Sequence, residues 1–114
     1  MRFLFIIIMC WISSQVMSAP GYLLLIGGGG EKFTANSWER EPYQWAVNSS
    51  ENKRVAIISF YEQSRALPDF FEKELGAERA HNFFINSRMV ADAPETYDTL
   101  RTFDVIFLKG GDQY

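Results

Sequence analysis

Two stretches that contain glycines could take part in ligand binding or catalysis, and each follows a short apolar run. Residues 27–30 are four glycines after the run 22–26, and residues 110–113 read Gly-Gly-Asp-Gln after the run 105–108. Because glycine has no Cβ, backbone N–H groups in such loops can approach a ligand or a developing oxyanion closely. The alternative is structural, since Gly-Gly and Gly-Asp are common turn pairs and glycine also permits close approach of a strand and a helix.

The glycine run lacks the other features of a nucleotide site. A dinucleotide-binding fingerprint needs Gly or Ala three positions after its second glycine, where this chain has Lys32 or Phe33. The chain also lacks the Gly-Lys-Ser/Thr sequence of a phosphate-binding loop. We therefore expect no cofactor.

The chain does not contain a recognisable catalytic triad. His81 is its single histidine, and without a neighbouring nucleophile and acid it is best interpreted as an edge-strand or surface residue. Ser59 ends an apolar run, but bulky and charged residues follow it in place of the small residues of a nucleophile elbow. Asp69 and Lys73 have the spacing of an ordinary helical ion pair. The acidic residues show no spacing suited to a metal or a carboxylate dyad, so no metal site is predicted.

Residues 1–19 have the three-part pattern of a secretory signal peptide. Arg2 supplies a positive charge, residues 3–12 are apolar, and residues 13–19 are small and polar. The apolar part is shorter than the ~20 residues of a membrane span. We expect cleavage after Ser18 or Ala19, a periplasmic or secreted protein, and no stable membrane span in the mature chain. A buried N-terminal strand and a retained anchor are the alternatives.

Composition excludes two further classes of function. The chain has 114 residues, 47% of them hydrophobic, and a formal net charge of −3, which is ordinary for one soluble domain or part of one. It contains no basic run or stripe, so no nucleic-acid partner is expected. The single cysteine, Cys10, lies in the predicted signal peptide, so the mature chain should have neither a disulfide nor thiol chemistry.

Apolar periodicity predicts alternating strands and helices in residues 20–114, which we treat as one domain or part of one. Strands are expected over 21–26, 55–60, 80–85 and 105–108, the last in the sheet interior. Helices are expected over 42–47, over 66–75 with Gly76 as a stop, and from Pro94, where Tyr97, Leu100 and Phe103 should face a core. Residues 86–93 are expected to be irregular.

This alternation is typical of an α/β fold with a parallel sheet and right-handed crossovers. Ligands of such sheets bind outside the carboxyl ends of the strands. The loops at residues 27–30, 59–63 and 110–113 should meet along that edge, and we expect a site there.

Several segments resemble the cyanophycinase and dipeptidase E family of serine peptidases. They are residues 22–31 (strand, glycine run, acid), residues 53–59 (basic start, strand, hydroxyl), residues 75–77 (Leu-Gly-Ala) and residues 103–113, which end in Gly-Gly-Asp-Gln. The resemblance covers nearly all of residues 20–114, and the final four residues are its most specific part. It implies an α/β parallel-sheet sandwich of the class I glutamine amidotransferase-like (flavodoxin-like) type, truncated in this chain.

The same resemblance implies roles for three residues. Gly111 and Asp112 would supply oxyanion N–H groups, and the Gln113 amide would contact a peptide or isopeptide substrate. The nucleophilic serine, on a Gly-x-Ser-Ala-Gly elbow, and its histidine and acid would follow Tyr114. Residues 20–114 would then be the N-terminal part of an exported serine-type peptidase, inactive alone.

Two expectations remain beside this one. The chain could instead be a non-enzymatic exported α/β domain that binds a small ligand. The apolar run 105–108 also predicts that residues 20–114 produced alone self-associate through an unpaired strand edge. The sequence is also compatible with a homo-oligomer as the natural form of the protein.

Overall fold

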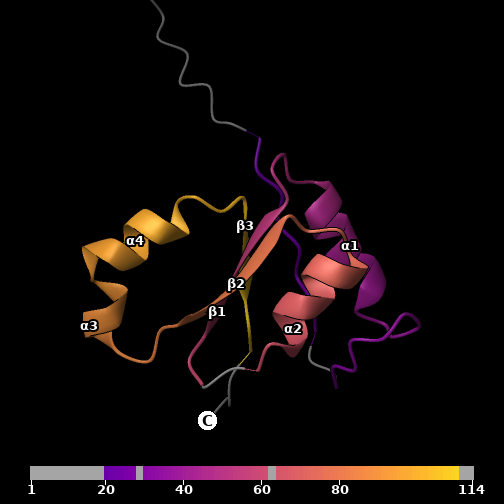
Figure 1. Cartoon of the computed structure of the whole chain (residues 1–114), viewed down its shortest axis with the longest axis horizontal. Coiled ribbons are helices and arrows are strands. Elements are labelled where there is room, and N and C mark those ends of the chain that lie inside the picture. Colours follow the sequence, from indigo (N-terminus) through magenta and orange to yellow (C-terminus); the bar gives the residue numbers. More distant parts are fainter. Residues whose placement is uncertain (1–19, 28–29, 62–63, 111–114) are drawn as a thin grey trace, which may run out of the picture.

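A computed structural model describes residues 20–27, 30–61 and 64–110. The predicted signal peptide and the candidate residues Gly111, Asp112 and Gln113 lie outside the described residues. Within them the chain forms a small α/β domain around an open parallel sheet of three strands, with helices on both sides (Figure 1).

The elements alternate as the periodicity predicts. In chain order they are α1 (Arg40–Asn48), β1 (Arg54–Ser59), α2 (Ala66–Asp69), the π-helical turn η1 (Phe70–Glu74), β2 (Arg79–Phe84), α3 (Arg88–Ala91), α4 (Pro94–Leu100) and β3 (Val105–Leu108). The strand order is β2-β1-β3. The predictions of strands near 55–60, 80–85 and 105–108, and of helices near 42–47, near 66–75 and from Pro94, are confirmed.

β1 is the central strand and is buried on both faces. Val55, Ala56 and Ile57 are fully buried in succession, as expected for a parallel strand covered from both sides. Val55 pairs with Ala80 on β2 and with Val105 on β3. Both edges of β1 are therefore occupied.

The two crossovers explain why helices cover both faces. The chain moves from β1 outward to β2 through α2 and η1, and then returns past β1 to β3 through α3 and α4. Crossovers of one hand that run in opposite directions place their helices on opposite faces, as Figure 1 shows. The core between the sheet, α1 and η1 is the larger one and includes Tyr43, Val47, Ile57 and Phe71.

Gly76 ends the second predicted helix as expected. Its φ of +73° is a left-handed conformation that glycine adopts without the steric cost of a Cβ. The N–H of Ala77 then donates to the carbonyl of Phe71 at 2.9 Å and closes the helix end. The chain can therefore turn directly into β2.

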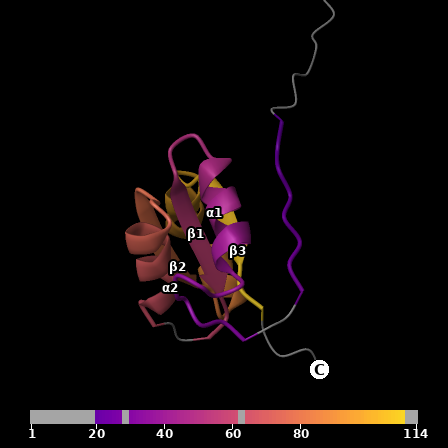
Figure 2. The same cartoon turned by 90° about the vertical axis from the view of Figure 1, so that its right-hand side faces the viewer.

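The predicted strand over residues 21–26 is wrong. The structure describes these residues as an extended, exposed segment without strand pairing, and Figure 2 shows it running beside the domain, separate from the sheet. An apolar run becomes a strand only where a neighbour accepts its backbone hydrogen bonds. Both edges of β1 are occupied, and the segment does not use the outer edge of β3, which has no partner among the described residues.

β3 is the outer strand of the three described, with Ile106 and Leu108 exposed, so its expected place in the interior of a larger sheet stays a prediction. Two further predictions need correction. Residues 86–93 are not irregular throughout, because α3 forms there with the Ser87 hydroxyl accepting a hydrogen bond from the Val90 N–H. Tyr97 is 64% exposed, since its position on α4 faces no covering element. None of the helices described is long and apolar enough to cross a membrane.

Candidate functional site

The carboxyl ends of β1 and β3 lie side by side where the strand order reverses. β1 ends at Ser59 and β3 at Leu108, and Gly110 follows two residues later. The N–H of Lys109 donates to the carbonyl of Ile58 at 2.9 Å, which holds the exit from β3 against β1. Open α/β sheets bind ligands at this type of switch point. The Gly-Gly-Asp-Gln stretch therefore begins where the fold favours a site.

Glu31 connects the first glycine run to this edge. One oxygen of its carboxylate lies 3.7 Å from the Lys109 ammonium, and the other accepts a hydrogen bond from the Tyr43 hydroxyl at 2.9 Å. The indole N–H of Trp38 donates to the carbonyl of Gly30 at 2.9 Å. Residues next to the two glycine stretches thus lie together, although the strand that was expected to bring the first stretch to this end of the sheet does not form.

A buried carboxylate fixes the loop that follows the first glycine run. Glu39, immediately before α1, is fully buried, and its Oε1 accepts the N–H groups of Lys32 and Phe33, each at 2.6 Å. Phe33 has a φ of +52°, so the two N–H groups converge on one anion. Burial raises the pKa of this carboxyl, but the N–H groups outweigh burial and hold the pKa below its ordinary value. Glu39 is therefore an anionic anchor for the loop.

Tyr43 joins this anchored loop to the core. Its ring stacks on Phe71 at 5.5 Å and meets Phe107 of β3 edge-on at 4.9 Å. Burial, followed by the hydrogen bond and charge of Glu31 and the charge of Glu39, raises the pKa of the Tyr43 hydroxyl well above its ordinary value. The hydroxyl therefore stays protonated well beyond neutral pH and keeps donating its hydrogen bond to Glu31.

Ser59 and His81 do not form a catalytic pair. The Ser59 hydroxyl accepts from the Tyr61 N–H at 3.3 Å and donates to the Tyr61 carbonyl at 3.2 Å, so it closes its own turn. His81 pairs in register with Ala56, three residues before Ser59. At about 3.3 Å per residue, the strand separates the two positions by about 10 Å. His81 is exposed on β2, as its interpretation as an edge-strand residue predicts.

Several acidic residues form ion pairs on the surface. Lys73 contacts Asp69 at 3.1 Å, so the predicted helical ion pair is confirmed. Across the described ranges, His, Cys, Asp and Glu side chains nowhere group in threes that could hold a metal ion.

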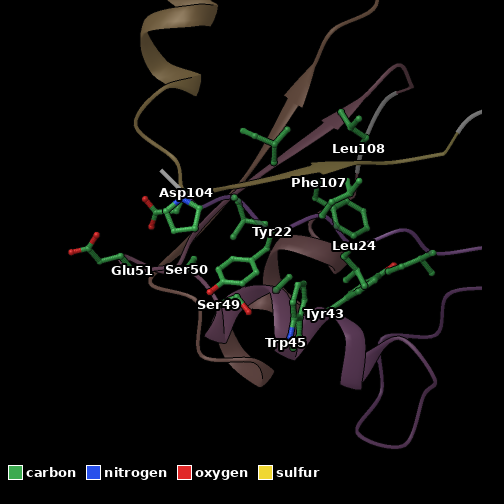
Figure 3. Close-up of a pocket in the computed structure, with 17 residues that line it drawn as sticks. Tyr22, Leu24, Tyr43, Trp45, Ser49, Ser50, Glu51, Asp104, Phe107 and Leu108 are labelled. Carbon is green, nitrogen blue, oxygen red and sulfur yellow. The ribbon is translucent and has the colours of Figure 1, made fainter. Parts of the chain in front are cut away.

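A cavity of about 510 Å³ lies between residues 20–26, α1 and β3 (Figure 3). Its walls are largely apolar and include Leu24 and Phe107, while the Tyr22 and Trp45 rings meet edge-on at 5.8 Å. The cavity is of the size that holds small ligands. Its other end carries the Asp104 carboxylate, which accepts hydrogen bonds from the N–H and side-chain amide of Asn52. This cavity was not predicted from the sequence.

Sequence reasoning located the glycine stretches but missed the side chains that hold them. Glu39, Tyr43 and the Glu31–Lys109 pair were not predicted, because their partners lie up to 78 positions apart in the chain. The one available signal was an acid at the start of a helix that closely follows a glycine run. Such an acid is a frequent acceptor of backbone N–H groups.

Comparison with protein-family models, with curated proteins and with solved structures found no match for this chain. The family assignment therefore remains a proposal.

Proposed function

We propose that this chain is the N-terminal part of an exported serine-type hydrolase of peptide or isopeptide bonds, with a class I glutamine amidotransferase-like fold of the cyanophycinase type. The observation that carries the proposal is the position of Gly110, at the carboxyl end of β3 and beside the end of β1. A Gly-Gly-Asp-Gln stretch that begins at a switch point suits the delivery of N–H donors to a substrate carbonyl.

The proposed chemistry is acyl transfer. A serine on an elbow after Tyr114 attacks the scissile carbonyl while the proposed histidine takes the hydroxyl proton, and negative charge develops on the carbonyl oxygen. The C–N bond then breaks, the amine leaves with that proton, and water releases the acyl group from the serine. The N–H groups of Gly111 and Asp112 stabilise that charge, while the Gln113 amide orients the substrate. Removal of one oxyanion donor typically costs about 2.7–4 kcal/mol of transition-state stabilisation. Glu31, with its contacts to Lys109 and Tyr43, acts as a positioning residue for the β3 exit.

A serine-reactive fluorophosphonate tests this proposal on the native, full-length protein. We expect labelling of one serine, mapped by mass spectrometry to an elbow after Tyr114, and loss of labelling when that serine is replaced by Ala. Absence of labelling on folded protein would contradict the hydrolase proposal.

A matched pair of variants tests the oxyanion loop. Gly111→Pro removes a backbone N–H, whereas Gly111→Ala retains it. We expect the proline variant to be labelled about 10²- to 10³-fold more slowly than the alanine variant. Equal labelling rates would show that the Gly111 N–H is not an oxyanion donor. The identification of the labelled serine would still stand.

The second candidate is a non-enzymatic domain that binds a small ligand, and the aromatic cavity beside β3 favours it. A small apolar ligand seated there would lie against Trp45 and change its fluorescence. We expect Trp45→Phe to remove the change, and Trp38→Phe, whose indole lies outside the cavity lining, to keep it. If the fluorophosphonate labels no serine while the Trp45 signal saturates, the binding function replaces the hydrolase.

A further inference from the structure

Two arginines lie at the amino ends of neighbouring strands. The candidate site is at the opposite ends of the strands, their carboxyl ends. Arg54 and Arg79 are the first residues of β1 and β2, and they are register partners. Their guanidinium carbons lie 5.2 and 5.4 Å from the centre of the same ring, that of Phe103. Phe103 is almost fully buried, so the ring is a fixed platform beneath both cations.

Three other arginines of the described residues form ion pairs. Arg40, Arg65 and Arg88 each lie within 4.0 Å of a carboxylate in the described part of the chain, whereas Arg101, like Arg54 and Arg79, does not. Among the described residues, neither Arg54 nor Arg79 has a carboxylate within that distance. Like charges held together without a counter-charge raise the free energy of the folded state, and an anion bound between them would lower it.

The neighbouring acid forms no ion pair with these arginines. Asp104 follows Phe103 directly, but its two carboxylate oxygens accept hydrogen bonds from the N–H and side-chain amide of Asn52, at 2.7 and 3.2 Å. These hydrogen bonds hold the carboxylate on the turn before β1. An oxyanion could therefore contact both guanidinium groups without displacing an ion pair of the described residues.

His81 lies in the positive field of this cluster. It is two residues after Arg79 on β2, so both side chains are on the same face of the sheet. Its ring stacks with Phe103 at 6.4 Å and meets Phe83 edge-on at 4.9 Å. Partial burial lowers the pKa of the imidazole, and the charges of Arg79 and Arg65 lower it further. A bound anion would oppose the effect of the arginine charges.

We propose that Arg54 and Arg79 form a binding site for a phosphate-type oxyanion, either inorganic phosphate or a phosphate monoester. A guanidinium offers a planar fork of N–H donors that matches the oxygens of phosphate, and cation–π contact with the Phe103 ring holds both groups in the same region of the surface. The site does not depend on the proposed hydrolase activity, since it uses the amino ends of the strands and not their carboxyl ends.

NMR of His81 in the full-length protein tests the site. The His81→Asn variant identifies its imidazole resonance, and inorganic phosphate then replaces chloride at constant ionic strength. We expect a saturable change in the His81 resonance and a higher His81 pKa at saturation. Glycerol phosphate is the second probe: tighter binding of it assigns the site to monoesters, and tighter binding of inorganic phosphate to the free ion. The same response to chloride, or no saturation with either probe, would overturn the proposal.

Three variants, each of which removes one positive charge, distinguish a defined binding site from general attraction of anions to a positive surface. Arg79→Gln and Arg54→Gln should weaken phosphate binding about tenfold or more, because each removes charge-assisted hydrogen bonds. Arg88→Gln, on α3, should leave it unchanged, since Arg88 pairs with Asp92. Equal weakening by all three would overturn the proposal. Arg79 is exposed, so its variant decides the question even if Arg54→Gln fails to fold.

Discussion

Replacement of Phe71 by Ala should remove a large share of the folding free energy. The Phe71 side chain is fully buried on η1, stacks on Tyr43 of α1 and meets Phe107 of β3 edge-on at 5.7 Å. It therefore joins the helical layer to the strand that leads to Gly110. Truncation of a core Phe to Ala typically costs about 3–5 kcal/mol, against a total stability of roughly 5–15 kcal/mol for a small domain.

Urea unfolding, followed by the fluorescence of Trp38 and Trp45, measures this loss. With a slope of about 2 kcal/mol per molar urea, Phe71→Ala should lower the midpoint by about 2 M. Phe84→Ala is the matched control, because the same side chain on β2 is 47% exposed. Its loss should cost about 1 kcal/mol and lower the midpoint by about 0.5 M.

The comparison of the two phenylalanines can refute the packing argument. If both variants lowered the midpoint equally, the stacked layer of Tyr43, Phe71 and Phe107 would not be the core of the domain. A smaller slope in Phe71→Ala alone would show a change in the surface exposed on unfolding. In that case the midpoint shift could not be read as lost packing.

Three other predictions concern the loop, the strand edge and the leader. Because folding lowers the pKa of Glu39, its contribution to stability is complete above pH 4.5 and is lost as the pH falls toward the folded pKa; Glu39→Gln should remove this part of the acid dependence in urea titrations at several pH values. Leu108→Lys should reduce the self-association of residues 20–114 in sedimentation velocity, whereas Glu78→Lys should not. The intact mass of the exported protein should show removal of 18 or 19 N-terminal residues, and a retained leader would contradict the signal-peptide prediction.

The two proposed sites lie at opposite ends of the strands. The carboxyl ends of β1 and β3 hold the anchored loop of Glu39 and the contact between Glu31 and Lys109. The amino ends hold the paired arginines over Phe103. A ligand at the carboxyl ends of the strands would therefore leave the amino ends accessible. The tests of the two proposals can succeed or fail independently.

Local signals in the sequence were sufficient for most of the elements. The β-branched run in β1, the glycine after η1 and the proline that opens α4 each act within a few residues, through side-chain shape or backbone conformation. Their alternation predicted a parallel sheet because parallel strands need crossovers long enough for a helix. The positions of the glycine stretches were also visible, since they depend only on residue type.

Tertiary structure alone decided which apolar runs pair and which groups meet. Residues 21–26 are as apolar as β1, yet they pair with no strand, although the outer edge of β3 has no partner among the described residues. The exposure of Tyr97 likewise depends on what covers α4, which helical spacing does not encode. The contact of Glu31 with Lys109 and the cation–π contacts of Arg54 and Arg79 with Phe103 join residues from distant parts of the chain. Such contacts follow from the strand order, and the strand order is set by the packing of the whole domain.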